Sequence, residues 1–146
     1  MPTVTSANKA EFDKQQLQKS GLLDLDKPKV VEEKPREIGE NLFAHNAKVG
    51  KSSLIYNLNH KDKELELHSL RTPANQRGQG YAKKAMEWLN SQADEMGYKS
   101  KLAASPLDKK TKLNKLVNFY KLHGYELTGK TYNQAGDPEM IRNPQK

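Results

Sequence analysis

The sequence predicts an α/β (α+β) fold with a mixed β-sheet and two main helices. Three observations support this prediction. Strand-like apolar segments come first, and a long segment then has the apolar spacing of a helix. A short strand-like segment, a second helical segment and two further strand-like segments complete the order. The predicted strands span residues 42–47, 53–58, 64–72, 100–104, 125–132 and 139–142, and the predicted helices run from Tyr81 to Met96 and from Leu113 to Gly124.

The first forty residues differ in composition from the rest of the chain. They are polar, and Pro28 and Pro35 lie within a charged stretch at residues 24–40. Residues 7–20 have the composition of a helix, but the apolar face of this helix is thin. Such a segment buries little apolar surface of its own. We therefore interpret residues 1–40 as a polar N-terminal extension, partly disordered or partner-binding, and residues 41–146 as the folded domain.

The segment at residues 81–96 carries the clearest helix signal. Its apolar residues recur at spacings of three, four and seven, which places them on one stripe of a helix. Gly97 follows, and glycine often ends a helix because it readily adopts the left-handed conformation. A helix with one apolar stripe packs on a sheet and thereby fixes the turn at its N-terminus. The stripe consists of Ala82, Ala85, Met86, Leu89, Ala93 and Met96.

The turn at residues 76–82 is the most informative functional feature of the sequence. It contains Gly78 and Gly80 and lies between a predicted strand and the predicted long helix. A glycine-rich turn that opens a helix presents unpaired backbone N–H groups, and the positive end of the helix dipole lies at the same place. The turn is therefore a predicted binding site for a phosphate or pyrophosphate group.

Two common phosphate-binding motifs fit this chain poorly. A dinucleotide-binding fingerprint requires a small residue three positions after its second glycine, but Lys83 stands three positions after Gly80. A nucleotide P-loop requires a glycine five residues before the Gly-Lys-Ser at residues 50–52, and His45 occupies that position. We therefore interpret the Gly-Lys-Ser sequence as a chance match.

A third motif, Arg/Gln-x-x-Gly-x-Gly/Ala, fits the run Arg77-Gly78-Gln79-Gly80-Tyr81-Ala82. A second pattern, aromatic-Tyr-x-x-x-Gly-aromatic, fits the run Phe119-Tyr120-Lys121-Leu122-His123-Gly124-Tyr125. The length between the two runs suits a helix, a short strand and a helix. With these two motifs, residues 41–143 resemble the GNAT superfamily of acyl-CoA-dependent N-acyltransferases.

The resemblance implies both a fold and a co-substrate. The sheet of this family is mostly antiparallel, and its two central strands splay apart to admit the pantetheine arm of acetyl-CoA. The turn then binds the pyrophosphate of the coenzyme, and the end of the preceding strand contacts it through the main chain. Asn114 is an approximate counterpart of an asparagine that often precedes the second helix. The implied cofactor-binding residues are Leu70, Arg71, Thr72, Arg77, Gly78, Gln79, Gly80, Tyr81, Ala82 and Asn114.

The strand before the turn carries the candidates for a general base. Strict alternation places Glu64, Glu66, His68 and Leu70 on one face of this strand. The resemblance implies Glu66, because several protein-acetylating members carry an amine-activating glutamate there. His68 is nearer to the turn and titrates near neutral pH, so both residues stay candidates, beside the alternative of solvated surface side chains. The resemblance also implies Tyr120 as the acid that protonates the leaving thiolate.

The implied function is transfer of an acetyl group from acetyl-CoA to a primary amine of a protein or small molecule. The first strand and the two helices that normally build the acceptor pocket of the family are not evident in residues 1–40. The identity of the acceptor therefore stays open. The alternative function is a non-catalytic GNAT-like binding module, which acts through its basic surface or N-terminal arm on a protein or nucleic-acid partner.

Length, cysteine content and charge exclude several further classes of protein. The 146 residues suit one domain and include no cysteine, so neither a disulfide framework nor a thiol nucleophile is expected. No apolar run approaches the ~20 residues of a membrane-spanning helix. The net charge of +7 suits anionic coenzyme A or an ordinary lysine-rich surface, and without an RNA-binding signature a nucleic-acid role is disfavoured. We expect a cytoplasmic monomer or homodimer that needs no metal and has no membrane contact.

Overall fold

The computed structural model describes residues 28–105, 112–131 and 136–145. The predicted helix at residues 7–20 lies outside these residues. The strands of the structure are β1 (Val30–Glu32), β2 (Arg36–Gly39), β3 (Leu42–Val49), β4 (Ser52–Asn59), β5 (Glu64–Arg71), β6 (Lys99–Ala103), β7 (Glu126–Thr131) and β8 (Pro138–Arg142). The helices are the short 3₁₀ helix η1 (Ala74–Gln76), α3 (Tyr81–Met96) and α4 (Leu113–Leu122).

The strands form one mixed sheet in the order β1-β3-β4-β5-β6-β8-β7, and β2 also pairs with β3. Every pair is antiparallel except β5 with β6, which is parallel. The parallel pair is joined through α3, as a parallel connection requires a crossover. The predicted α/β class, with a mostly antiparallel sheet and two main helices, is therefore confirmed.

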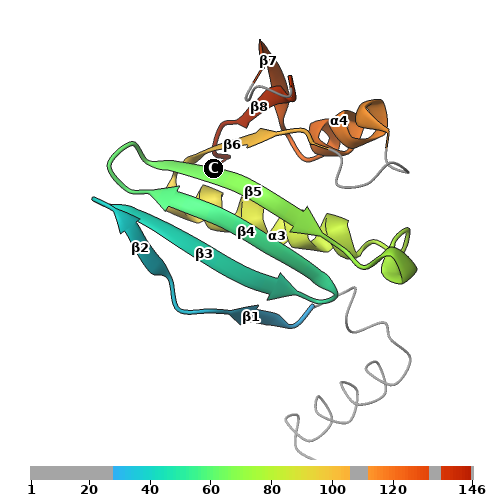
Figure 1. The fold of residues 1–146 in the computed structure, drawn as a ribbon, viewed down its shortest axis with the longest axis horizontal. Coiled ribbons are helices and arrows are strands. Elements are labelled where there is room, and N and C mark those ends of the chain that lie inside the picture. The colour runs from blue at the N-terminus through green and yellow to red at the C-terminus, as the bar shows by residue number, and fades with distance from the viewer. Residues whose placement is uncertain (1–27, 106–111, 132–135, 146) are drawn as a thin grey trace, which may run out of the picture.

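Helix α3 covers one face of the sheet, behind β4 and β5 in Figure 1. Its predicted apolar stripe is buried at Ala85, Met86, Leu89 and Ala93, and these side chains join one core with the inward-facing residues of the strands. Gly97 ends the helix at φ 73°, in the left-handed conformation that the sequence predicts. The strand residues of this core are Ala47, Val49, Leu54, Tyr56, Leu58, Leu65, Leu67, Leu102 and Met140.

The sheet begins inside the segment that the sequence analysis interprets as an N-terminal extension. β1 pairs with the second half of β3 through Val30 and Val49, and β2 pairs with the first half through Arg36 and Ala44. Residues 30–39 therefore form two short strands beside β3. The sequence does not reveal them, because each strand is short and exposed at nearly every position, so neither shows a regular buried face.

The two central strands separate after a short parallel ladder. β5 and β6 pair from Glu64 with Lys99 up to Leu67 with Leu102, and the pairing ends there. Figure 1 shows the two strands diverging beyond that point, with α4 beside β6. Among the described residues, no strand pairs with the β6-facing edge of residues 68–71. This divergence opens the space in which the candidate site lies.

One residue interrupts the pairing of β4 with β5. Tyr56 faces Leu67, and the next residue, Ile55, faces Ser69, so His68 is an extra residue on β5. Such a β-bulge shifts every later side chain to the other face of the strand. Leu70 consequently faces Leu54 on the core side of the sheet. The expectation that Leu70 shares a face with Glu64 and Glu66 is therefore wrong.

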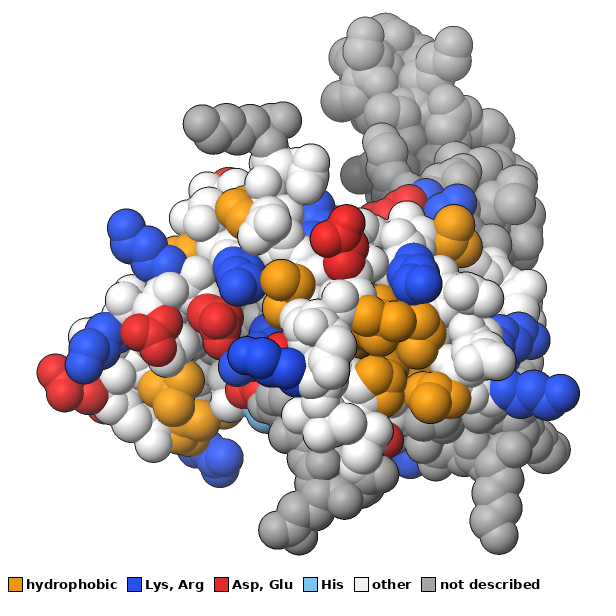
Figure 2. Space-filling view, turned by 90° about the horizontal axis from the view of Figure 1, so that it is seen from above, with side chains coloured by type: hydrophobic (Ala, Val, Ile, Leu, Met, Phe, Trp, Pro, Cys, Tyr) orange, Lys and Arg blue, Asp and Glu red, His pale blue; other side chains and the backbone are white. Residues whose placement is uncertain are grey.

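The side of the molecule that carries α4, β7 and β8 has a mixed surface. Figure 2, which is viewed from above Figure 1, shows a group of hydrophobic side chains on this side with Lys and Arg side chains around it. Of the residues that the structure describes, Leu122 of α4 is the most exposed large hydrophobic residue, at 85%. Among the described residues, no helix is both long and apolar enough to cross a membrane.

Candidate active site

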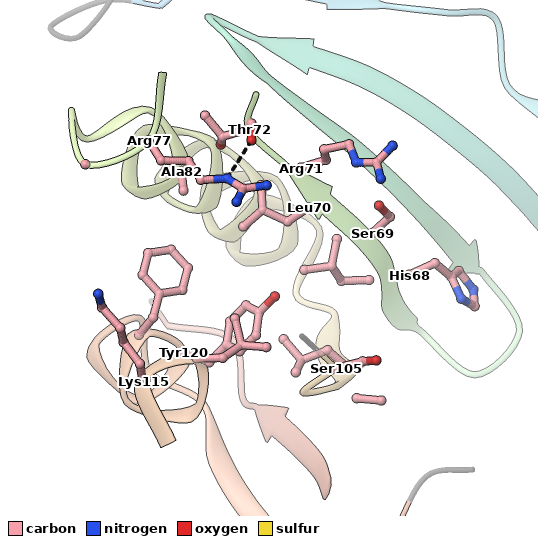
Figure 3. A pocket seen from close by; sticks show the side chains of 16 residues that line it. His68, Ser69, Leu70, Arg71, Thr72, Arg77, Ala82, Ser105, Lys115 and Tyr120 are labelled. Carbon is pink, nitrogen blue, oxygen red and sulfur yellow. Dashed lines mark hydrogen bonds between the residues drawn. The ribbon is translucent and has the colours of Figure 1, made fainter. Parts of the chain in front are cut away.

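A cavity of about 420 Å³ lies where β5 and β6 diverge. Its walls are the second half of β5, the end of β6, one face of α4, and the turn that opens α3 (Figure 3). The cavity therefore joins the predicted anion-binding turn to the predicted catalytic tyrosine. The lining residues are Leu67, His68, Ser69, Leu70, Arg71, Thr72, Arg77, Gly78, Ala82, Leu102, Ala103, Ser105, Lys115, Leu116, Phe119 and Tyr120.

The charge of the cavity wall favours an anionic ligand. The described lining residues include three permanent cations, Arg71, Arg77 and Lys115, and no carboxylate. Clefts lined by charges of one sign concentrate ligands of the opposite sign. The remaining wall is largely apolar, so one part of the cavity suits a charged group and another part suits an uncharged chain.

The turn before α3 has the geometry of an anion site. Gly78 and Gly80 both have positive φ angles, 80° and 91°, which glycine adopts without steric cost. Gly80 caps α3 without any side-chain hydrogen bond, and the first helical bond runs from the Lys84 amide to the Gly80 carbonyl at 3.1 Å. The earlier amides, of Tyr81 and Ala82, precede this ladder. A Cβ atom built on Gly78 would meet no other atom within 4 Å, so the turn is open.

Two hydrogen bonds fix the end of β5 against its surroundings. The Arg77 Nε donates to the Thr72 carbonyl oxygen at 3.0 Å, which ties the turn to the strand (Figure 3). The Thr72 hydroxyl also contacts the hydroxyl of Ser52 on β4 at 2.6 Å, and both residues are buried. Thr72, at the end of β5, is therefore bonded both to β4 and to the turn before α3, which fixes this side of the cavity.

Tyr120 projects from α4 into the cavity. Its side chain is 7% exposed and packs edge-on against Phe119 and Tyr125, with ring centroids 5.4 and 5.9 Å away. Figure 3 shows its hydroxyl directed toward β5. Burial first, and the neighbouring Tyr125 second, raise the pKa of the Tyr120 phenol to about 12. The phenol therefore keeps its proton at neutral pH and is available as a hydrogen-bond donor.

His68 and Glu66 form a charged contact at the other end of the cavity. The His68 Nε2 lies 3.4 Å from the Glu66 Oε1, within ion-pair distance and slightly longer than a typical N–H···O hydrogen bond. The Glu66 carboxylate raises the pKa of His68, while burial and the charge of Lys101 oppose this effect. The same contact with His68 lowers the pKa of Glu66. Below the raised pKa of His68, the two residues therefore form an ion pair.

The predicted site residues fall into two groups. Leu70, Arg71, Thr72, Arg77, Gly78 and Ala82 line the cavity, as do His68 and Tyr120. Glu66 lies outside the lining and reaches it only through His68. The other four predicted residues do not line it: Gly80 caps α3, Tyr81 is buried, Asn114 is exposed on α4, and Gln79 is exposed in the turn.

Apart from Tyr120, the contribution of α4 to the cavity wall did not follow from the sequence motifs. Lys115, Leu116 and Phe119 also line the cavity. Leu116 precedes Tyr120 by four residues and Lys115 precedes Phe119 by four, so both pairs are neighbours on the helix surface. Helical spacing around Tyr120 was therefore a signal that could have found them. Ser69 and Ser105 had no such signal, because their place depends on the divergence of β5 and β6.

Comparison with known protein families agrees with this geometry. Residues 30–125 match the model of the acetyltransferase (GNAT) family, which is more than half of the chain. The chain therefore belongs to the acetyltransferase (GNAT) family, and acetyl-CoA is the co-substrate of this family. A comparison with curated proteins gives no match.

Solved structures share the fold at low sequence identity. An acetyltransferase of Bacillus subtilis in complex with CoA has a TM-score of 0.57 at 8% identity, over 82% of this chain and 100% of that chain. An aminoglycoside 6′-N-acetyltransferase complexed with coenzyme A has a TM-score of 0.55 at 17% identity, over 75% and 77%. A nourseothricin acetyltransferase has a TM-score of 0.54 at 14% identity, over 72% of this chain and 66% of its own length. This chain thus spans about two thirds of the last of these.

Proposed function

We propose that this protein transfers an acetyl group from acetyl-CoA to a primary amine of a protein or a small molecule. One observation carries the proposal. A single cavity begins at an open, glycine-rich helix N-terminus, has three cations and no carboxylate among its described lining residues, and reaches the protonated phenol of Tyr120. A long anionic thioester fits this order of groups, because its phosphates and its reacting carbonyl are far apart.

Binding of acetyl-CoA would use main-chain groups at two places. The amides of Tyr81 and Ala82, with the dipole of α3, would hold the pyrophosphate. The pantetheine arm would lie in the gap between β5 and β6 and bond to the main chain of Leu70, Arg71 and Thr72. This edge of β5 is suited to that role, because the described part of β6 pairs with β5 only as far as Leu67.

The acceptor amine would have to lose a proton before it attacks. A lysine-like ammonium group has a pKa near 10.4, so its deprotonation at pH 7 costs about 4–5 kcal/mol. Glu66 and His68 are the two candidates for the base, and they are in contact with each other. Holding the amine beside the thioester would contribute about 7–11 kcal/mol, so positioning is the larger effect.

The chemical step would then proceed by direct attack. The amine nitrogen forms a bond to the carbonyl carbon, a backbone N–H near Leu70 stabilises the oxyanion, and the C–S bond breaks as the thiolate leaves. Tyr120 is the proposed acid. With a pKa of about 12 against about 8.5 for an ordinary thiol, complete proton transfer would be uphill by about 5 kcal/mol. Tyr120 would therefore stabilise the departing sulfur mainly by donating a hydrogen bond.

The proposal is tested by calorimetric titration with acetyl-CoA, followed by a free-thiol assay with a panel of amines. We expect binding of acetyl-CoA and release of thiol that depends on the amine. Mass spectrometry of lysates treated with the protein and labelled acetyl-CoA would identify a protein acceptor. Binding without turnover on any amine would instead favour the non-catalytic module. Salt-sensitive RNA or DNA binding without CoA binding would favour a nucleic-acid role.

A further inference from the structure

The position of His68 separates the roles of the two candidate bases. His68 lines the cavity, whereas Glu66 does not. Figure 3 places His68 and Arg77 at opposite ends of the cavity, so His68 lies at the end away from the turn. If the turn holds the phosphates, the end with His68 is left for the acceptor amine. A direct proton transfer from the amine to Glu66 would have to pass His68 first.

His68 lies at the bulge of β5. β4 has no residue opposite it, and its side chain lies beside that of Glu66, two residues earlier on the same strand. The two side chains then meet, with the Glu66 Oε1 3.4 Å from the His68 Nε2. Both are partly solvent-accessible, at 22% and 40%, so a water-borne or protein-borne amine can reach the imidazole.

The contact also determines which nitrogen of His68 accepts a proton. A carboxylate accepts hydrogen bonds only, so the Glu66 contact favours a hydrogen on the Nε2 of His68. The neutral imidazole then carries its lone pair on Nδ1. When Nδ1 takes a proton, the positive charge of the imidazolium is balanced by Glu66.

Other charged groups near His68 are few within the described part of the chain. On β4, Ile55 faces Ser69 and Asn57 faces Glu66, and both are uncharged. On β6, Lys101 opposes protonation of His68, and its ammonium group lies 3.2 Å from the Glu64 Oε1. Glu66 is therefore the carboxylate that acts on His68, and Glu64 acts on Lys101.

We propose that His68 is the general base, with Nδ1 as its proton acceptor, and that Glu66 is a positioning residue that orients the imidazole and stabilises its charged form. This proposal rests on the acetyltransferase function proposed above. In the step, an N–H bond of the ammonium group breaks and the proton moves to Nδ1. The released electron pair of the nitrogen then forms the C–N bond, and the C–S electrons leave with the sulfur. The second proton that the nitrogen loses on becoming an amide goes to the departing thiolate, which leaves as the thiol.

The first test is a titration of the four histidines by NMR in the full chain. We compare the wild type with Glu66→Gln and with the matched control Glu64→Gln, which removes the same charge two residues away. Glu66→Gln is expected to lower the pKa of His68, and Glu64→Gln to lower it much less. An unchanged His68 pKa in Glu66→Gln, or an equal decrease in both variants, would overturn the positioning role.

The second test measures thiol release from acetyl-CoA with two amines. Nα-acetyl-lysine amide is protonated at pH 7 and needs a base, whereas hydroxylamine is already neutral. His68→Gln is expected to lower kcat/KM by ~10²–10⁴-fold with the lysine compound and far less with hydroxylamine. Glu66→Gln is expected to lower it less than His68→Gln, and to move the pH profile to lower pH.

The outcomes of the second test separate the two proposals. Equal losses with both amines in His68→Gln, or a larger loss in Glu66→Gln than in His68→Gln, would overturn the assignment of His68 as base. If the wild type releases no thiol with either amine, this result would count against the acetyltransferase function and would also remove the base role of His68. The NMR titration would still decide whether Glu66 holds His68.

Discussion

The carboxylate of Asp94 and the guanidinium of Arg142 meet side by side, although they are 48 residues apart. Arg142 Nη1 and Nη2 donate to the two carboxylate oxygens at 2.8 and 3.0 Å, and Asp94 also accepts from the Gln145 amide at 2.8 Å. The pair joins the last turns of α3 to β8. Arg142 is buried, at 7% side-chain exposure, so its charge depends on Asp94.

Asp94→Asn is expected to lower the free energy of unfolding by about 2–3 kcal/mol, because it leaves a buried guanidinium without its counter-charge. Denaturation by urea measures this difference, with Glu95→Gln on the exposed side of α3 as the control. Arg142 lowers the pKa of Asp94, so the stabilisation is present above the unfolded carboxyl pKa of about 4 and is lost at lower pH. A gap between the two proteins that stays constant down to pH 2 would contradict this account.

The hydroxyls of Ser52 and Thr72 are a test of coupling across β4 and β5. Thr72→Val leaves the buried Ser52 hydroxyl without its partner and is expected to cost about 1–3 kcal/mol. The double variant Ser52→Ala with Thr72→Val is expected to lose less unfolding free energy than the two single variants lose together. Acetyl-CoA affinity should stay within about threefold, because the proposed contact of Thr72 is through the main chain; a tenfold loss would assign the contact to its side chain.

Gly80→Asp is expected to abolish acetyl-CoA binding, because it places a negative charge at the N-terminus of α3. Gly80→Asn is the matched control: it has nearly the same shape, and asparagine tolerates the positive φ of 91° better than most residues. Calorimetry with acetyl-CoA should show a much smaller loss of affinity for Asn than for Asp. Unchanged affinity in Gly80→Asp would refute the assignment of the turn to the pyrophosphate.

Tyr120→Phe is expected to lower kcat by about 10²-fold or more, with the Kd for acetyl-CoA nearly unchanged. The neighbouring Tyr125 provides the control, since its ring lies 5.9 Å from that of Tyr120 but its buried hydroxyl interacts with Ser100 and does not line the cavity. Tyr125→Phe should change the free energy of unfolding by about 1 kcal/mol or less and should leave turnover intact. Equal turnover in Tyr120→Phe and the wild type would remove Tyr120 from the mechanism.

Local patterns in the sequence predicted most of the fold. The helix at residues 81–96 has the predicted bounds, because its apolar stripe and Gly97 are both local signals. β1 and β2 escaped prediction because each is only three or four residues long and exists through its pairing with β3, a non-local contact. The bulge at His68 escaped for a similar reason, since no glycine or proline marks it and only the register with β4 reveals it.

The candidate site could be predicted only where local sequence patterns mark it. The turn and Tyr120 carry motifs of fixed spacing, so their residues could be named in advance. The place of Lys115 and the order of His68 and Glu66 depend on how α4 and the bulge lie in space. The residue types along β5 could not show that His68 lines the cavity whereas Glu66 does not.

β1 and β2 pair with successive halves of β3 and form an outer edge of the sheet, which affects how molecules associate. Outer strands expose amide and carbonyl groups that can recruit a strand from another chain. Here that border is interrupted by residues 33–35, which include Pro35, and by an irregular step between Glu37 and Gly39. Neither stretch offers a long straight template, so we expect this edge of the sheet to recruit strands from other molecules poorly.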